Sequence, residues 1–173
     1  MLKDKMQAAL NDQVNAELYS AYLYLSMSAY FESENLGGAA NWMRIQAQEE
    51  LAHAMKIHDF IIEREGLAIL KAVEAPPTKW DGPLAVFKDA YQHEQKVTGL
   101  INDLVDLSLD ERDHATNIFL QWFVTEQVEE EANASAIVQD LEMVGSHKNG
   151  LFMLDRELGR RMPPAPGAEA DAE

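Results

Sequence analysis

Two halves of this 173-residue chain place potential metal ligands with the same spacing, inside long stretches of helical apolar periodicity. The six positions form two series: Glu17, Glu50 and His53, and then Glu94, Gln127 and Glu130. In each series the second residue follows the first by 33 positions, and the third follows the second by three. Residues three apart are neighbours on one helix face, so each half offers a pair of ligands from one helix and a single ligand from another.

Five stretches have helical periodicity, and turn-forming residues separate them. The predicted helices cover residues 4–33, 38–65, 83–107, 111–144 and 151–161. Pro83 suits the first turn of a helix, and Gly66 stands where a helix C-terminal glycine is expected. The segment 67–82 has little periodicity and forms a long connection.

The lengths of the connections predict the topology. A helix of about 28 residues is about 42 Å long at 1.5 Å per residue. The joints at 34–37 and 108–110 are too short to cross that length, so they join antiparallel neighbours. The segment 67–82 can extend to about 55 Å, which is enough to run the length of a bundle. We therefore expect an all-α fold: an antiparallel four-helix bundle with one long crossover between the second and third helices, plus a short fifth C-terminal helix.

The predicted helix centres lie close to four of the candidate ligands, namely Glu17, Glu50, Glu94 and Gln127. Because the helices of a bundle run side by side, side chains at their centres converge midway along the core. Buried charges without partners cost many kcal/mol, and a pair of metal cations removes that cost. The two series of ligands therefore predict a carboxylate-bridged di-iron site within one subunit.

Composition narrows the alternatives. The chain has no cysteine, which excludes disulfides, thiolate metal sites and iron–sulfur clusters. Its net charge of −16 disfavours nucleic acid as a partner, because phosphate binding needs clustered Lys and Arg. No apolar run is long enough to span a membrane, and the N-terminus lacks the apolar segment of a signal peptide, so we expect a cytoplasmic protein. Residues 1–161 are expected to form one domain, and 162–173 a flexible acidic tail.

Four motifs give the chain a specific resemblance. They read NAELYSAYLY (15–24), NWM (41–43), QEELAHA (48–54) and EQVEEE (126–131). With these motifs the chain resembles the non-haem ferritins of the prokaryotic type, within the ferritin-like di-iron carboxylate family, from about residue 5 to 161. The resemblance implies iron storage and detoxification: a ferroxidase that oxidises Fe²⁺ with O₂ or H₂O₂, and a hollow homo-oligomeric shell, usually of about 24 subunits, that keeps the Fe³⁺ mineral.

The resemblance also implies roles for individual residues. The first iron would take Glu17, Glu50 and His53 as ligands, while Glu50 would bridge to a second iron held by Glu94 and Glu130, with Gln127 nearby. Oxygen ligands make the second site harder than the first. A third, neighbouring iron site would use the family positions that correspond to Glu49, Glu126 and Glu129.

Two further expectations concern redox groups. Tyr24 lies seven residues after Glu17, on the same helix face, and the matching tyrosine of the family hydrogen-bonds at the di-iron site and can supply an electron, so Tyr24 is a candidate catalytic residue. The haem-bearing bacterioferritins place an axial methionine directly after the bridging glutamate, where this chain has Leu51. No haem is therefore expected.

Two other classes of function are also compatible with the sequence. One is a rubrerythrin-like di-iron peroxidase or oxidase, although such relatives usually carry an added Cys₄ iron domain and this chain has no cysteine. The other is a helical scaffold bundle without metal chemistry. Adding Fe²⁺ in air while following the ferric absorbance separates the scaffold from the iron-oxidising proteins.

Overall fold

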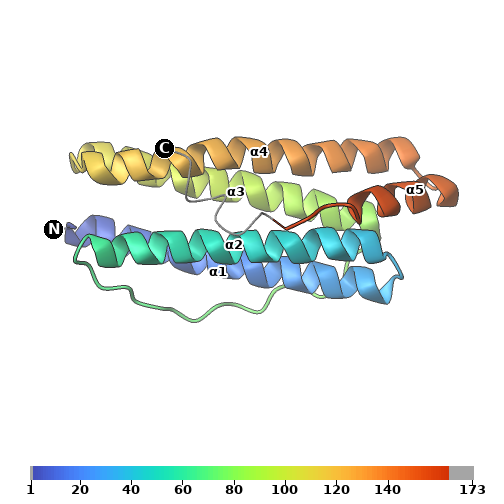
Figure 1. Ribbon diagram of the computed structural model, residues 1–173, viewed down its shortest axis with the longest axis horizontal. Coiled ribbons are helices and arrows are strands. Elements are labelled where there is room, and N and C mark those ends of the chain that lie inside the picture. The colour runs from blue at the N-terminus through green and yellow to red at the C-terminus, as the bar shows by residue number, and fades with distance from the viewer. Residues whose placement is uncertain (1, 164–173) are drawn as a thin grey trace.

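The computed structural model describes residues 2–163, and five α-helices account for most of them (Figure 1). The helices are α1 (Asp4–Ser33), α2 (Gly37–Glu63), α3 (Pro83–Asp110), α4 (His114–Val144) and α5 (Lys148–Leu158). The predicted flexible tail at 162–173 lies outside the described residues from 164 onward. None of the helices formed by residues 2–163 is both long and apolar enough to cross a membrane.

The four long helices form the predicted bundle (Figure 1). Helix α1 is antiparallel to α2, and α3 is antiparallel to α4. The connection between α2 and α3 runs along the whole length of the bundle, so these two helices are parallel, as the length of the segment 67–82 predicts. Helix α5 lies at the end of the bundle where α4 finishes.

Several helix ends differ from the sequence-based bounds because of local capping. Helix α3 continues to Asp110, and the turn to α4 is made by Arg112, whose φ is 54°. Asp113 then caps α4 by accepting a hydrogen bond from the backbone N–H of Thr116 at 3.2 Å. Helix α2 stops at Glu63 because Glu65, rather than Gly66, adopts the positive φ of 59°.

The core is divided into two apolar clusters with a polar layer between them. One cluster includes Phe31, Met43 and Phe87 and lies toward the end that carries α5. The other includes Met6, Ile57 and Phe123 and lies toward the opposite end. Burial of apolar side chains on both sides holds the four helices in register around the polar layer. Any functional group in that layer is thereby placed on rigid elements.

Helix α5 docks onto the start of α2 at very close range. Gly38 and Gly159 lie against each other, since a Cβ built on Gly159 would be 3.2 Å from the Cα of Gly38. Asp155 accepts a hydrogen bond from the backbone N–H of Ala39 at 2.9 Å, so a side chain of α5 satisfies one of the free N–H groups of the first turn of α2. The carboxylate also lies at the positive end of that helix dipole.

Replacing Gly38 by Ala should displace α5. The added Cβ would lie 1.6 Å from the backbone oxygen of Asp155, so the two helices must separate. Overpacking of this kind costs about 1–3 kcal/mol. We expect faster hydrogen exchange in α5 and a melting temperature lower by several degrees, since 1 kcal/mol shifts it by about 2–4 °C in a chain of this size.

Gly37→Ala is the matched control, because a Cβ on Gly37 meets nothing within 4 Å. It should leave hydrogen exchange in α5 unchanged. Equal protection of α5 in the two variants would contradict the docking described here.

Candidate metal centre

The polar layer between the two apolar clusters contains all six residues of the two spaced series, and each is at most 5% exposed. One comes from α1, two from α2, one from α3 and two from α4: Glu17, Glu50, His53, Glu94, Gln127 and Glu130. The equal spacing in the sequence thus corresponds to one level of the bundle.

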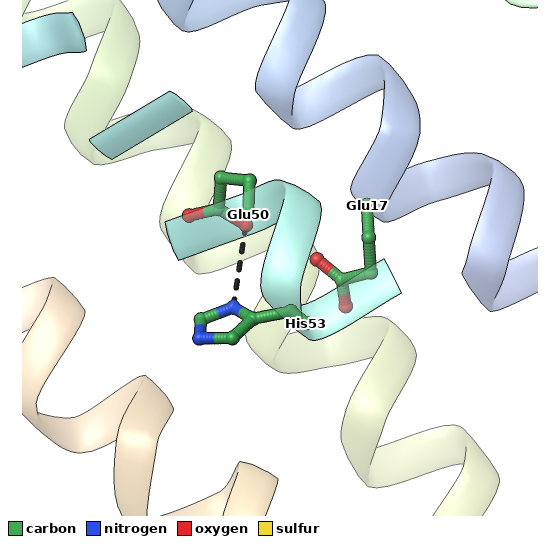
Figure 2. Close-up of side chains that lie close together, drawn as sticks. All are labelled: Glu17, Glu50 and His53. Atoms are coloured by element: carbon green, nitrogen blue, oxygen red, sulfur yellow. Dashed lines mark ion pairs between the residues drawn. The ribbon is translucent and has the colours of Figure 1, made fainter. Parts of the chain in front are cut away.

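Three of these side chains meet at one point (Figure 2). Glu17, Glu50 and His53 each offer a ligand atom, and these atoms lie within 4.8 Å of one another. The His53 Nδ1 atom is 3.5 Å from Oε2 of Glu50, one helical turn away on α2. Within residues 2–163 this is the one grouping of three carboxylate or imidazole ligand atoms at such close range. Two carboxylates and an imidazole form a donor set that suits iron.

Glu94 and Glu130 complete the layer from the α3–α4 side. Tyr24, which is fully buried, donates a hydrogen bond from its hydroxyl to Oε1 of Glu94. Gln127 donates from Nε2 to Oε2 of the same glutamate at 3.3 Å. Both oxygens of Glu94 therefore have a protein donor, and Gln127 acts here as a hydrogen-bond donor to a candidate ligand.

Two further glutamines each hold one oxygen of a candidate ligand. Gln13 donates to Oε1 of Glu17 at 2.8 Å. Gln46 donates to Oε1 of Glu50 at 3.0 Å and to Oε2 of Glu130 at 2.7 Å. The second oxygen of Glu17, Oε2, is buried and has no hydrogen-bond partner. An orphaned carboxylate oxygen beside another carboxylate and an imidazole is what a cation would satisfy.

The protonation of the layer reflects burial and mutual repulsion. Burial raises the pKa of Glu17 to about 8, and the charge of Glu50 adds to the shift. Burial raises the pKa of Glu130 to about 9, assisted by the charges of Glu50 and Glu94. Burial also raises the pKa of Glu50 well above its usual value and raises that of Glu94, and repulsion by Glu94 contributes at Glu50. Carboxyl groups at such close range hold protons unless a cation is present, so metal binding must release protons.

The other predicted acids lie on the flank of this layer. Glu49 is half-buried and forms an ion pair with Arg161, from the segment after α5. Burial raises the pKa of Glu49, Arg161 opposes that shift, and Glu126 lies near enough to add to it. Glu129 is exposed. Glu49 and Glu126 are therefore neighbours, and Glu129 follows Glu126 by three residues on α4.

Several residues at the site were not anticipated from the sequence. Gln13 and Gln46 each precede a ligand by four positions and are themselves 33 positions apart, so the repeated spacing could have identified them. Trp122 lies edge-on to the ring of His53, with ring centroids 5.3 Å apart. The ring of His93 likewise stands edge-on to that of Tyr24, at 6.3 Å.

A comparison with known families matches residues 7–144 to the ferritin-like domain. A bacterial non-heme ferritin from Bacteroides fragilis (strain 638R) is 46% identical over 161 residues, covering 93% of this chain and all of that protein. A bacterial non-heme ferritin from Staphylococcus aureus (strain MRSA252) is 39% identical over 161 residues, covering 93% of this chain and 97% of the relative.

Solved structures are similar over almost the full length. An open pore ferritin from the hyperthermophilic archaeon Archaeoglobus fulgidus has a TM-score of 0.93 and 55% identity, covering 94% of this chain and all of that one. An engineered closed form of the same ferritin has a TM-score of 0.94 and 54% identity, covering 95% of this chain.

Proposed function

The chain belongs to the ferritin family and serves in iron storage, and on that premise we propose that each subunit oxidises Fe²⁺ at a dinuclear centre formed by the buried polar layer. The ferric product would be kept inside a hollow homo-oligomeric shell, with about 24 subunits as the expected size for a closed symmetric assembly of this family. Iron is both the substrate and the stored cargo of the protein.

One observation carries this proposal: four buried glutamates and one histidine meet in the interior of a single subunit, with an orphaned oxygen on Glu17. Such a layer destabilises the protein unless cations or protons neutralise it. The layer takes candidate ligands from all four long helices, so the folded subunit would hold the site in a fixed geometry.

The residues divide into two metal positions. Glu17, Glu50 and His53 would bind the first Fe²⁺, since their ligand atoms already lie together. Glu50 would bridge to a second Fe²⁺ bound by Glu94 and Glu130, with Gln127 holding Glu94 in place. Each Fe²⁺ gives one electron, so two irons together reduce O₂ or H₂O₂ by two electrons without releasing a one-electron product.

Tyr24 is suited to a redox role beside the second position. Its hydroxyl donates to Glu94, so a proton lost on oxidation of the phenol has an acceptor within hydrogen-bond reach. Burial, reinforced by the charge of Glu94, raises the pKa of Tyr24 well above its usual value, which keeps the phenol protonated before oxidation. We propose that Tyr24 can supply an additional electron to the centre.

Aerobic iron loading followed by size-exclusion chromatography with light scattering tests this function. The protein should elute as a large assembly many times the 19.4 kDa chain mass, should oxidise Fe²⁺ rapidly, and should carry the ferric product in the same peak. A monomer that leaves the iron to precipitate would contradict storage. A large assembly with no accelerated oxidation would contradict the dinuclear centre.

The flanking acids are proposed as a third iron site, and the triple variant Glu49→Ala, Glu126→Ala, Glu129→Ala tests it. We expect the first oxidation event to stay nearly intact. The ratio of iron oxidised to O₂ consumed should fall and later turnovers should slow, because a third iron would supply another electron and pass Fe³⁺ toward the interior. An oxygen electrode together with stopped-flow absorbance measures both quantities, and unchanged values would assign these acids to the solvated surface.

A further inference from the structure

Arg161 connects the segment after α5 to the polar layer through a short series of contacts. Its side chain is 20% exposed and forms an ion pair with Glu49. Its guanidinium carbon lies 4.4 Å from the centre of the Trp42 ring. Its Nη1 atom donates a hydrogen bond to Oε1 of Gln46 at 2.7 Å. The ion pair and the ring hold the guanidinium in one place, so its third contact is directed at Gln46.

Gln46 passes this contact on to two candidate ligands. Its side chain is fully buried, and its Nε2 atom donates to Oε2 of Glu130 at 2.7 Å and to Oε1 of Glu50 at 3.0 Å. A guanidinium group has only hydrogen-bond donors, so the amide oxygen of Gln46 must face Arg161 and the NH₂ group must face the carboxylates. Arg161 thereby selects one of the two orientations of the amide.

We propose that Arg161 is a positioning residue for the dinuclear centre and acts through Gln46. The pair fixes Glu50 of α2 and Glu130 of α4 relative to each other, and it makes this geometry depend on how the segment after α5 is docked. This inference rests on the proposed function, because it concerns the metal position that Glu50 and Glu130 share.

The loss of Arg161 has a defined structural consequence. The amide of Gln46 becomes free to turn over, and in the flipped orientation its oxygen faces two carboxylates that it cannot hydrogen-bond when they are ionised. Glu50 and Glu130 then lose the donor that joins them across the bundle. Glu17 and His53, the other two residues of the first position, have no hydrogen bond or ion pair with Arg161 within residues 2–163, so that position should be less affected.

Anaerobic titration with Co²⁺ tests the inference with a readout other than Fe²⁺ oxidation. Co²⁺ absorbance reports both the binding curve and the coordination geometry. In Arg161→Met the weaker of the two binding phases should shift to higher Co²⁺ concentration by about 10-fold or more, as is typical when a partner that orients a ligand is removed. The melting temperature of the metal-free protein is measured in parallel and should change little.

Arg160→Met is the matched control, because it removes the same charge at the neighbouring position. Arg160 is 74% exposed, and within residues 2–163 its guanidinium forms an ion pair only with Glu157, at 2.6 Å. Its Co²⁺ titration should overlay that of the wild type. An equal shift in both variants would mean that general charge, rather than positioning, governs binding, and would overturn the inference.

A double-mutant cycle decides whether Arg161 acts through Gln46. Gln46→Met alone should weaken the same Co²⁺ phase, and adding Arg161→Met should weaken it little further. A lysine lacks the planar, forked donors of arginine, so in Arg161→Lys the side chain can bind Gln46 or Glu49 but not both. The Co²⁺ concentration at which the weaker phase is half-complete should therefore lie between the values of the wild type and of Arg161→Met. Additive shifts, or a Co²⁺ spectrum that no single variant alters, would overturn the inference.

This experiment separates the inference from the proposed function. If the wild-type protein binds Co²⁺ in two phases but does not accelerate Fe²⁺ oxidation, the proposed function fails while the cycle still decides the role of Arg161. If oxidation is fast and the cycle is additive, the proposed function stands and the positioning role fails.

Discussion

Replacing His53 by Ala should abolish fast Fe²⁺ oxidation while leaving the shell assembled. His53 is the candidate nitrogen ligand in the group that it forms with Glu17 and Glu50, and its side chain is 3% exposed. Losing a residue that only orients a metal ligand typically lowers metal affinity or activity by about 10- to 100-fold, and losing the ligand itself should have a larger effect. The initial rate measured by stopped-flow absorbance should therefore fall by at least about 100-fold. Light scattering should still show the full assembly, because His53 lies inside the bundle.

His58→Ala provides the control on the same helix. His58 is 26% exposed and its Nδ1 atom pairs with Asp59 at 2.9 Å, away from the polar layer. This variant should oxidise Fe²⁺ at the wild-type rate. If His53→Ala retained that rate as well, the assignment of the first metal position would be wrong.

Replacing Glu130 by Gln should stabilise the metal-free protein at alkaline pH and weaken its metal binding. The folded-state pKa of Glu130 is raised from 4.5 to about 9, mainly by burial. A carboxyl group whose pKa is higher in the folded state than in the unfolded state binds its proton more tightly when the protein is folded. Its contribution to the free energy of unfolding is fully present below about pH 4.5 and is lost as the pH rises toward 9. The wild-type apoprotein should therefore melt at lower temperature at pH 9 than at pH 6, and Glu17, with a pKa of about 8, adds to this trend.

Glu130→Gln removes the group that must ionise and keeps an oxygen that can accept from Gln46. Its melting temperature at pH 9 should exceed that of the wild type by several degrees, since 1 kcal/mol corresponds to about 2–4 °C here. Adding Zn²⁺ should raise the wild-type value at pH 9 and raise that of the variant much less. Calorimetry at matched protein concentration measures each value.

Glu63→Gln, at the exposed end of α2, is the charge control and should leave the pH dependence unchanged. A wild-type apoprotein that becomes more stable between pH 6 and 9 would contradict the protonation of the layer described above.

Features that depend on regular periodicity could be predicted from the sequence. The apolar pattern predicted the observed bounds of α1, and the length of the segment 67–82 predicted the parallel arrangement of α2 and α3. The two spaced series predicted that Glu17, Glu50 and His53 lie together, because residues near helix centres share one level in a bundle. These inferences need only helix geometry and chain length.

Features that depend on contacts between distant segments could not be predicted in this way. Arg161 reaches Gln46 and Glu49 only because Gly38 and Gly159 allow α5 to approach α2 closely. Asp113 is buried and accepts a hydrogen bond from Arg64 at the end of α2, and with Asp113 as its N-cap α4 starts three residues after the predicted position at 111. No local pattern encodes an ion pair whose partner comes from a distant segment, such as Arg64 with Asp113 or Arg161 with Glu49.

We propose that the polar layer binds two iron ions inside each subunit, and anomalous diffraction tests this proposal most directly. Crystals soaked anaerobically with Fe²⁺ should show two iron peaks per subunit, about 3.5–4 Å apart as in other two-metal sites. One peak should touch Glu17, Glu50 and His53, and the other should touch Glu50, Glu94 and Glu130. Iron found only on the surface of the subunit, with no peak between α1, α2, α3 and α4, would contradict the central claim.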